Sequence, residues 1–135
     1  CKSYKPDVVV LDMGDKFART GGFARTDEAL KANAIHARMI AKQHECAVFY
    51  MSQLSADAEG KVILNQAMME GSRTGKAAEA DLMILIAKNP PKQETNNVDE
   101  PEDLQRHLNV VKNKLTGWHG SRICTLNYKI GRYEV

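Results

Sequence analysis

The chain has 135 residues, of which 27% are charged, and its formal net charge is +2. This length suits one domain with a modest core, so we expect residues 1–135 to form a single domain. The small net charge gives no reason to expect a strongly basic nucleic-acid-binding protein, although local basic clusters can bind phosphate. No apolar run approaches the ~20 residues of a membrane-spanning helix, so we expect no membrane association.

The three cysteines, Cys1, Cys46 and Cys124, form no C-x-x-C pair and show no metal-ligand spacing. Cys46 and Cys124 lie in or beside apolar runs, where a free thiol packs like a small apolar side chain. This usage predicts buried free thiols in a reducing compartment, and we therefore expect a cytoplasmic protein.

The first half of the chain alternates between predicted strands and helices. Val8–Leu11 is an apolar run that favours burial on both faces, as in a central parallel strand. Residues 27–44 place apolar side chains at helical spacing, with Thr26 as the expected N-cap. Residues 46–51 form a second short buried strand, and a helical stretch is expected around residues 60–70.

The second half predicts strands that are interrupted by one long loop. Residues 82–87 are a third apolar strand. Residues 90–107 are rich in Pro, Asn and acids, which is typical of a flexible exposed loop. Residues 108–114 and 123–128 are two more strands, joined by a turn. The chain therefore predicts an α/β fold, with parallel strands, flanking helices and a C-terminal antiparallel hairpin.

Polar side chains follow the carboxyl ends of these strands, where α/β sheets bind their ligands. Magnesium prefers carboxylate, phosphate and water oxygens, and lysine charge can stabilise a transferring phosphoryl group. An amide can both donate and accept a hydrogen bond, so it can sense a γ-phosphate. These residues suit a nucleoside triphosphate with Mg²⁺. They are Asp12, Ser52, Gln53, Lys88, Lys112 and Lys114.

Four stretches in chain order resemble the second half of a RecA-like P-loop ATPase domain. They are "VVVLD", "VFYMSQL", "EGSRTGKAAEADLMILIAKN" and "NVVKNKLTGWHG…IGRYE". The resemblance is to hexameric replicative DNA helicases of the DnaB and phage primase–helicase types, and it covers nearly the whole chain. It implies an ATP-dependent helicase that translocates on single-stranded DNA and unwinds duplex. It also implies ATP and Mg²⁺ as cofactors, a homohexameric ring, a primase as candidate partner, and the bacterial cytosol, with a phage gene as one origin.

The same resemblance implies roles for individual nucleotide-binding residues. Asp12 resembles the acid that holds magnesium through water, and Gln53 resembles the sensor that couples the γ-phosphate to the DNA loops. Lys112 and Lys114 resemble the pair that reaches into the nucleotide of the neighbouring subunit. Two further residues resemble base contacts: a basic side chain against adenine and a stacking aromatic ring. These are Lys88 and Tyr128.

Residues 71–76 resemble the central-channel loop that grips single-stranded DNA. The implied phosphate contacts are Arg73 and Lys76. Two glycines in the segment indicate a backbone that approaches a ligand closely, although a solvated loop is the alternative interpretation. The implied DNA-binding residues are Gly71, Ser72, Arg73, Gly75 and Lys76.

Two departures from the family pattern affect the expected chemistry. The family usually has arginine where this chain has Lys114, and lysine cannot form a planar bidentate fork to phosphate. Either Lys114 acts as a point charge or another residue, such as Arg122, takes the role. No G-x-x-x-x-G-K-[ST] occurs in the sequence, so we expect the phosphate loop and the catalytic glutamate in a longer parent, upstream of Cys1. This fragment alone is then expected to be inactive.

Several interpretations without catalysis remain open. Asp12 could cap a turn, and Lys112 and Lys114 could form an exposed strand face. Asp15 could join Asp12 in a nuclease-like metal pair, but we expect a solvated loop acid. Trp118 could belong to a functional loop or be buried in a turn. For the whole chain, the alternatives are another RecA-like ATPase of the recombinase or clock type, or a non-hydrolytic binding or assembly module.

Overall fold

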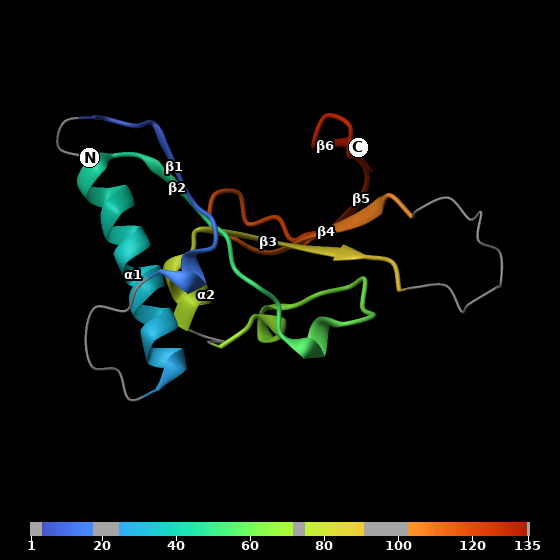
Figure 1. The fold of residues 1–135 in the computed structure, drawn as a ribbon, viewed down its shortest axis with the longest axis horizontal. Helices are drawn as coiled ribbons and strands as arrows, with labels where there is room; N and C mark the ends of the chain where they lie inside the picture. The colour runs from blue at the N-terminus through green and yellow to red at the C-terminus, as the bar shows by residue number, and fades with distance from the viewer. Residues whose placement is uncertain (1–3, 18–24, 72–74, 91–102, 135) are drawn as a thin grey trace. The chain divides into compact units, whose positions relative to one another are not determined.

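The computed structural model describes residues 4–17, 25–71, 75–90 and 103–134, which fall into two compact units (Figure 1). One unit combines Cys1–Ser55 with Gln66–Ala80, and the other combines Ala56–Asn65 with Asp81–Val135. The expectation of a single domain over residues 1–135 stays a prediction.

The first unit is built on two parallel strands and the helix that connects them. Strand β1 (Val8–Leu11) pairs with β2 (Ala47–Tyr50), in a register that aligns Leu11 with Tyr50. Helix α1 (Thr26–His44) joins the strands and packs against β2. Both strands and this helix confirm the predicted β–α–β arrangement. The buried side chains of α1 are Ala29, Leu30, Ala34 and Ala37.

The ends of α1 differ slightly from the prediction. Thr26 is the first helical residue, and the N-cap is Arg25, which makes no side-chain capping bond. The Arg25 guanidinium instead binds Asp27 in the first turn at 3.0 Å. At the other end Glu45 adopts a left-handed conformation with φ 51°. None of the helices in the described ranges is both long and apolar enough to cross a membrane.

The predicted helix around residues 60–70 is wrong. The only helical turn there is η3 (Gln66–Met68), which has 3₁₀ geometry. Gly60 has φ +67°, and Val62 and Ile63 are β-branched, so the local preference for α-helix is low. The nearby helix, α2 (Gly75–Glu79), begins after the predicted helical stretch, within the segment predicted to be a loop.

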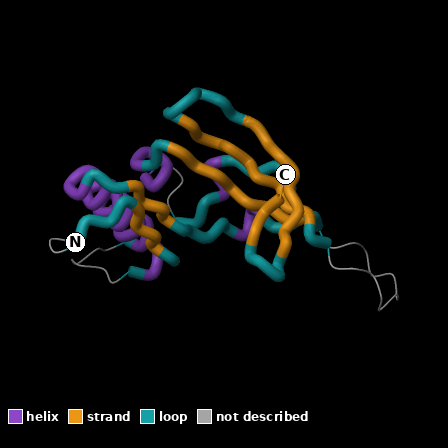
Figure 2. The backbone as a smooth tube through the Cα atoms, turned by 90° about the horizontal axis from the view of Figure 1, so that it is seen from above, coloured by secondary structure: helices purple, strands orange, loops and turns teal. Residues whose placement is uncertain are grey.

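The second unit contains a four-stranded antiparallel sheet, in the order β3-β4-β5-β6 (Figure 2). Its strands are β3 (Leu82–Lys88), β4 (Gln105–Asn113), β5 (Gly120–Asn127) and β6 (Arg132–Glu134). The predicted hairpin is thus the middle of a larger sheet, because β3 pairs antiparallel with β4. Strand β4 begins inside the predicted loop 90–107, of which residues 91–102 lie outside the described residues.

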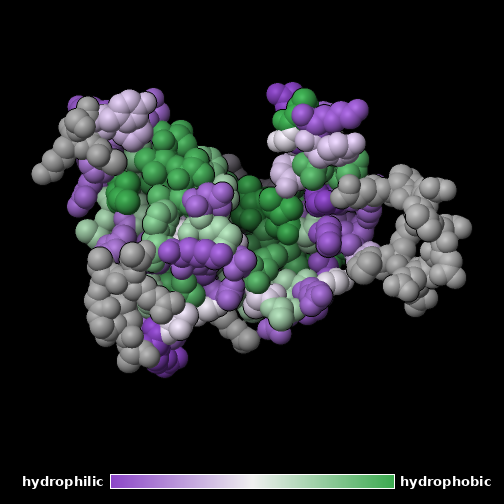
Figure 3. Space-filling view, viewed as in Figure 1, coloured by the Kyte–Doolittle hydropathy of each residue, from purple (hydrophilic) through white to green (hydrophobic). Residues whose placement is uncertain are grey.

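One face of the parallel pair remains exposed. Val8 and Val10 are 51% and 57% exposed, and Phe49 on the neighbouring strand is 55% exposed. These side chains contribute to the apolar surface over β1 and β2 (Figure 3). The expected burial of β1 on both faces is therefore wrong for this chain, since burial on both faces requires a packed layer on each side of the strands.

Candidate functional site

The carboxyl ends of β1 and β2 meet at one edge of the parallel pair. The pairing continues past the strands, because the Met51 amide donates to the Leu11 carbonyl at 3.1 Å. The Gly14 amide then donates to the Met51 carbonyl at 2.9 Å. Asp12 follows β1 directly, and Gln53 lies three residues beyond the end of β2. Two sequence-predicted site residues therefore emerge at the same edge.

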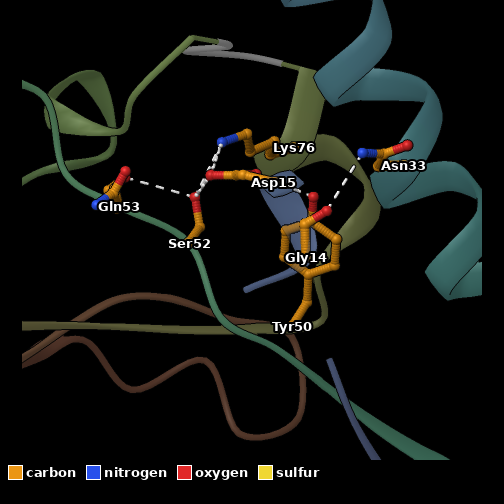
Figure 4. Close-up of polar contacts among 7 residues, drawn as sticks. All are labelled: Gly14, Asp15, Asn33, Tyr50, Ser52, Gln53 and Lys76. Atoms are coloured by element: carbon orange, nitrogen blue, oxygen red, sulfur yellow. Dashed lines mark hydrogen bonds and ion pairs between the residues drawn. The ribbon is translucent and has the colours of Figure 1, made fainter. Parts of the chain in front are cut away.

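Asp12 and Gln53 are both exposed, and neither side chain makes a hydrogen bond or ion pair with another residue in the described part of the chain. The backbone at Gln53 is nevertheless fixed, since its carbonyl accepts the Glu70 amide at 3.2 Å and the Ser52 hydroxyl at 3.4 Å (Figure 4). A carboxylate and an amide held this way are available to a ligand.

Next to these two residues lies a polar cluster formed by the buried Lys76 and the half-buried Asp15, Tyr50 and Ser52 (Figure 4). The Asp15 Oδ1 atom accepts the Tyr50 hydroxyl at 2.9 Å. Its Oδ2 atom accepts the Ser52 hydroxyl at 2.6 Å and the Lys76 ammonium at 2.8 Å. Lys76 also donates to the Ser52 hydroxyl oxygen at 2.9 Å, so every polar group in the cluster has a partner.

Burial and hydrogen bonding set the protonation of this cluster. The side chains of Lys76 and Asp15 are only 3% and 10% exposed. Burial acts to raise the pKa of Asp15, but the bonds from Lys76, Ser52 and Tyr50 outweigh it and hold that pKa below its ordinary value. Burial, together with the Asp15 charge, raises the pKa of the Tyr50 hydroxyl. The cluster is thus a carboxylate–ammonium pair with a neutral phenol beside it.

The prediction that Asp15 is a solvated loop acid is wrong. The turn η1 (Gly14–Lys16) directs Asp15 toward the end of β2, where Tyr50 and Ser52 supply donors. The turn is packed closely against β2, since a Cβ atom on Gly14 would lie 2.3 Å from the Tyr50 ring. No local pattern marks this cluster, because its partners come from distant parts of the sequence.

The segment predicted to bind DNA is only partly described. Ser72 and Arg73 lie outside the described residues. Gly75 is buried at the start of α2, and Lys76 points its ammonium at Asp15 rather than at solvent. Gly71 has φ +77°, and a Cβ atom there would lie 2.1 Å from a Leu30 methyl group. Packing against α1 thus explains this glycine without a ligand.

The remaining predicted residues belong to the second unit. Lys88 ends β3 and is exposed, and Tyr128 follows β5 with 64% of its surface exposed. Lys112 is half-buried in β4. Lys114 lies in the turn after that strand, so the expected common strand face is wrong. Its ammonium is 3.4 Å from the Asp81 carboxylate, in an exposed ion pair.

Arg122 and Trp118 form a cation–π contact in the same unit. The Arg122 guanidinium lies 5.1 Å from the centre of the Trp118 ring. Trp118 is 42% exposed, so the alternative in which the turn buries its tryptophan is wrong. A cation over an indole face is held in a limited set of orientations. Arg122 is therefore a partly oriented guanidinium on the surface of β5.

The acid at the strand end fits a magnesium ion held mainly by other groups. The described residues contain no group of three or more His, Cys, Asp or Glu side chains that could hold a metal ion. Asp12 is a single exposed carboxylate, which suits a metal that takes its other oxygens from phosphate and water. Asp15 does not add a second ligand in this arrangement, because Lys76, Ser52 and Tyr50 occupy both its oxygens.

Comparison with solved structures shows the fold. The chain superposes on a structure described as an ATPase domain, with TM-score 0.72 and 14% identity, covering 94% of this chain and 43% of that one. A second match is the structure of a DnaB-like replicative helicase and its interactions with primase, with TM-score 0.70 and 13% identity, covering 94% and 29%. No family model matches the chain, and no curated protein matches its sequence.

The fold is therefore that of part of a RecA-like helicase ATPase domain. The chain spans less than half of the length of either solved structure. The resemblance expected from the four sequence motifs is confirmed at the level of the fold.

Proposed function

We propose that this chain is the part of an ATP-dependent replicative DNA helicase that senses the nucleotide and contacts single-stranded DNA. The observation that supports it is the pair of exposed polar side chains, Asp12 and Gln53, which follow the carboxyl ends of adjacent parallel strands. In a fold of this kind, ligands bind beyond the carboxyl ends of the strands. Because the solved relatives are longer, activity is proposed for the polypeptide that also carries a phosphate loop.

In this proposal Asp12 interacts with the metal ion of the nucleotide, and Gln53 interacts with its γ-phosphate. Magnesium, when bound with ATP, supplies the positive charge that neutralises the phosphate oxygens. Asp12 would hold this ion through water, as the acceptor at the end of β1. The Gln53 amide donates to a γ-phosphate oxygen or accepts from a water molecule, so its bonding changes with the state of the nucleotide.

Residues of the second unit are proposed to neutralise the phosphate charge and to contact the base of the nucleotide. Lys112 and Lys114 place positive charge against the nucleotide of the next subunit in a hexameric ring. Because Lys114 already has Asp81 as an exposed partner, Arg122 is a second candidate for this role. Lys88 and Tyr128, both exposed, are the proposed base contacts.

The DNA contact is proposed for the segment that leads into α2. Arg73 is its proposed main cation, and Gly71, Ser72 and Gly75 belong to the same proposed contact. DNA binding of this kind releases the counterions that surround the phosphates. Its affinity therefore falls as the salt concentration rises, because this release becomes less favourable. A primase partner and action in the bacterial cytosol belong to the same proposal, since one solved match is a helicase studied for its interactions with primase.

The test uses the intact polypeptide that carries this chain and its phosphate loop. Asp12→Asn and Gln53→Ala should each reduce ATP hydrolysis in the presence of single-stranded DNA by ~100-fold or more. The matched controls are Asp7→Asn and Gln43→Ala, which change exposed residues that do not lie at the carboxyl ends of the strands. Unchanged DNA-stimulated turnover in Gln53→Ala would show that Gln53 is not the sensor. A wild-type protein that binds DNA without any hydrolysis would favour the binding module.

A further inference from the structure

We infer that the buried ion pair between Lys76 and Asp15 fixes the position of the nucleotide-sensing residues, Asp12 and Gln53, relative to the start of α2, so that the sensing residues and α2 respond together to ligands. This inference rests on the proposed function, and it makes Lys76 and Asp15 positioning residues. It also replaces the expectation that Lys76 itself contacts DNA phosphate.

Three segments converge on this one pair. Asp15 lies three residues after Asp12, in the turn that follows β1. Ser52, which bonds to both members of the pair, directly precedes Gln53. Lys76 is the second residue of α2 and directly follows the glycine that ends the segment 71–75. Asp12 and Gln53 are therefore each connected to Lys76 through at most three residues and one set of hydrogen bonds.

The far end of α2 is also fixed. The Arg38 side chain of α1 donates to the Glu79 carbonyl and lies 3.8 Å from the Glu79 carboxylate. The short helix is thus held on α1 at Glu79 and on the strand ends at Lys76. The start of α2 cannot leave the strand ends without breaking the buried pair.

The chemistry of the pair favours common movement over separation. A buried charge that loses its partner retains a large desolvation penalty, so separating Lys76 from Asp15 is unfavourable. The Ser52 hydroxyl and the Tyr50 phenol each donate a further hydrogen bond to Asp15, and these bonds fix the orientation of its carboxylate. A phosphate contact by Lys76 would require this separation, whereas a positioning role requires that the pair stay intact.

The two roles predict opposite results for the partner residue. If Lys76 contacted DNA phosphate, Asp15→Asn would release the ammonium and would not weaken the response to DNA. If the pair positions the site, removing either charge has the same effect. The measurement is the ratio of ATP hydrolysis with and without single-stranded DNA in the intact polypeptide, together with DNA affinity over a range of salt concentrations.

We expect Lys76→Met and Asp15→Asn each to lower this ratio by about 10-fold or more, which is the effect of ~1.4 kcal/mol. The slope of DNA affinity against salt should stay at the wild-type value in both. Controls with the same charge changes at exposed sites are Lys31→Met and Asp7→Asn. The inference is overturned if Asp15→Asn leaves the ratio unchanged while Lys76→Met reduces the salt slope by about 0.7, the value for one lost phosphate contact.

Milder variants keep the test informative if the charge changes impair folding. Ser52→Ala removes the hydroxyl between the pair and Gln53 without leaving a charge unpaired, and should lower the ratio several-fold. Lys76→Arg retains the charge and should keep a higher ratio than Lys76→Met. Normal ratios in Ser52→Ala and Lys76→Met would overturn this inference alone, whereas a wild-type protein without DNA-stimulated hydrolysis would overturn the proposed function as well.

Discussion

The Lys76 ammonium lies 2.8 Å from the Asp15 carboxylate, although 61 residues separate them in the sequence. This contact joins the turn after β1 to the start of α2 within one compact unit. The adjoining hydroxyls of Tyr50 and Ser52 come from β2 and its end, so the cluster connects three segments through polar bonds. The stability of this region should therefore depend on charge as well as on apolar packing.

Removing the ammonium should destabilise the protein strongly. Lys76→Met leaves the Asp15 carboxylate buried without its cation, and breaking a buried pair in this way costs about 3 kcal/mol or more. Asp15→Asn leaves the ammonium without a carboxylate, so a similar cost is expected. Urea unfolding followed by circular dichroism measures both.

The double variant tests whether the two residues act as a pair. Asp15→Asn/Lys76→Met should be more stable than the sum of the single effects predicts, by at least ~1 kcal/mol. Lys31→Met serves as the control for the loss of an exposed lysine. Additivity within about 0.5 kcal/mol would show that the contact contributes no coupling energy.

Acid should remove the contribution of Asp15. Because the folded protein holds the pKa of Asp15 below its ordinary value, the folded state favours the ionised carboxylate. The resulting stability is fully present above the unfolded pKa of about 3.9 and is lost as the pH falls toward the lower folded value. The stability difference between wild type and Asp15→Asn should therefore be constant above about pH 5 and shrink below about pH 4.

Urea unfolding of both proteins between about pH 3 and pH 7 measures this difference, because that range spans the unfolded pKa of the carboxyl. The Asp7→Asn variant, which removes one exposed carboxylate from the same unit, is the control for the loss of a negative charge. A difference between wild type and Asp15→Asn that does not change with pH would contradict the ionised pair in the folded protein.

Adding one methyl group at Gly14 should disturb the polar cluster through its Tyr50 ring. The new Cβ atom would lie 2.3 Å from the Tyr50 ring, so the ring or the turn has to shift. The expected cost of Gly14→Ala is about 1–3 kcal/mol, as for other cases of overpacking. Gly60→Ala is an unsuitable control because of its positive φ, so Gln43→Ala, which changes an exposed residue of the first unit, is preferable. Equal stability of Gly14→Ala and wild type would contradict the close packing of the turn.

Most of the fold could be predicted from sequence because its signals are local. The apolar runs at Val8–Leu11 and Leu82–Lys88 and the helical spacing across α1 each lie within one element. Residues around 60–70 were harder to predict, because weak helical preference competes there with hydrogen bonds to distant backbone. The Ser55 amide, for example, donates to the Met68 carbonyl at 2.8 Å.

The candidate site could be predicted only where a strand end identifies it. Asp12 and Gln53 follow the ends of paired strands, so their common edge follows from parallel pairing. The roles of Asp15 and Lys76 depend on contacts across 35 to 61 residues, and no spacing in the sequence encodes such contacts. Lysine in a Gly-rich segment is usually solvated, so burial of Lys76 contradicts the local pattern.

Arg122 is the second candidate, beside Lys112 and Lys114, for the cation that acts on the neighbouring nucleotide in the proposed ring. Arg122→Ala should reduce DNA-stimulated ATP hydrolysis more than Lys114→Ala, by ~10³-fold if it serves as an arginine finger. The reason is that guanidinium can bind phosphate with two parallel bonds, whereas Lys114 is already paired with Asp81. Trp118→Ala should lower the rate less, since it removes only the ring over which Arg122 lies.

Mixed rings show whether this cation acts between subunits. Rings that combine Asp12→Asn with Arg122→Ala subunits should recover part of the activity that each variant lacks alone, because some interfaces then contain both intact residues. Arg132→Ala, an exposed arginine on β6, is the matched control and should hydrolyse ATP at the wild-type rate. A larger loss in Lys114→Ala than in Arg122→Ala would assign the role to Lys114. Equal loss in Arg122→Ala and Arg132→Ala would show that Arg122 contributes only surface charge.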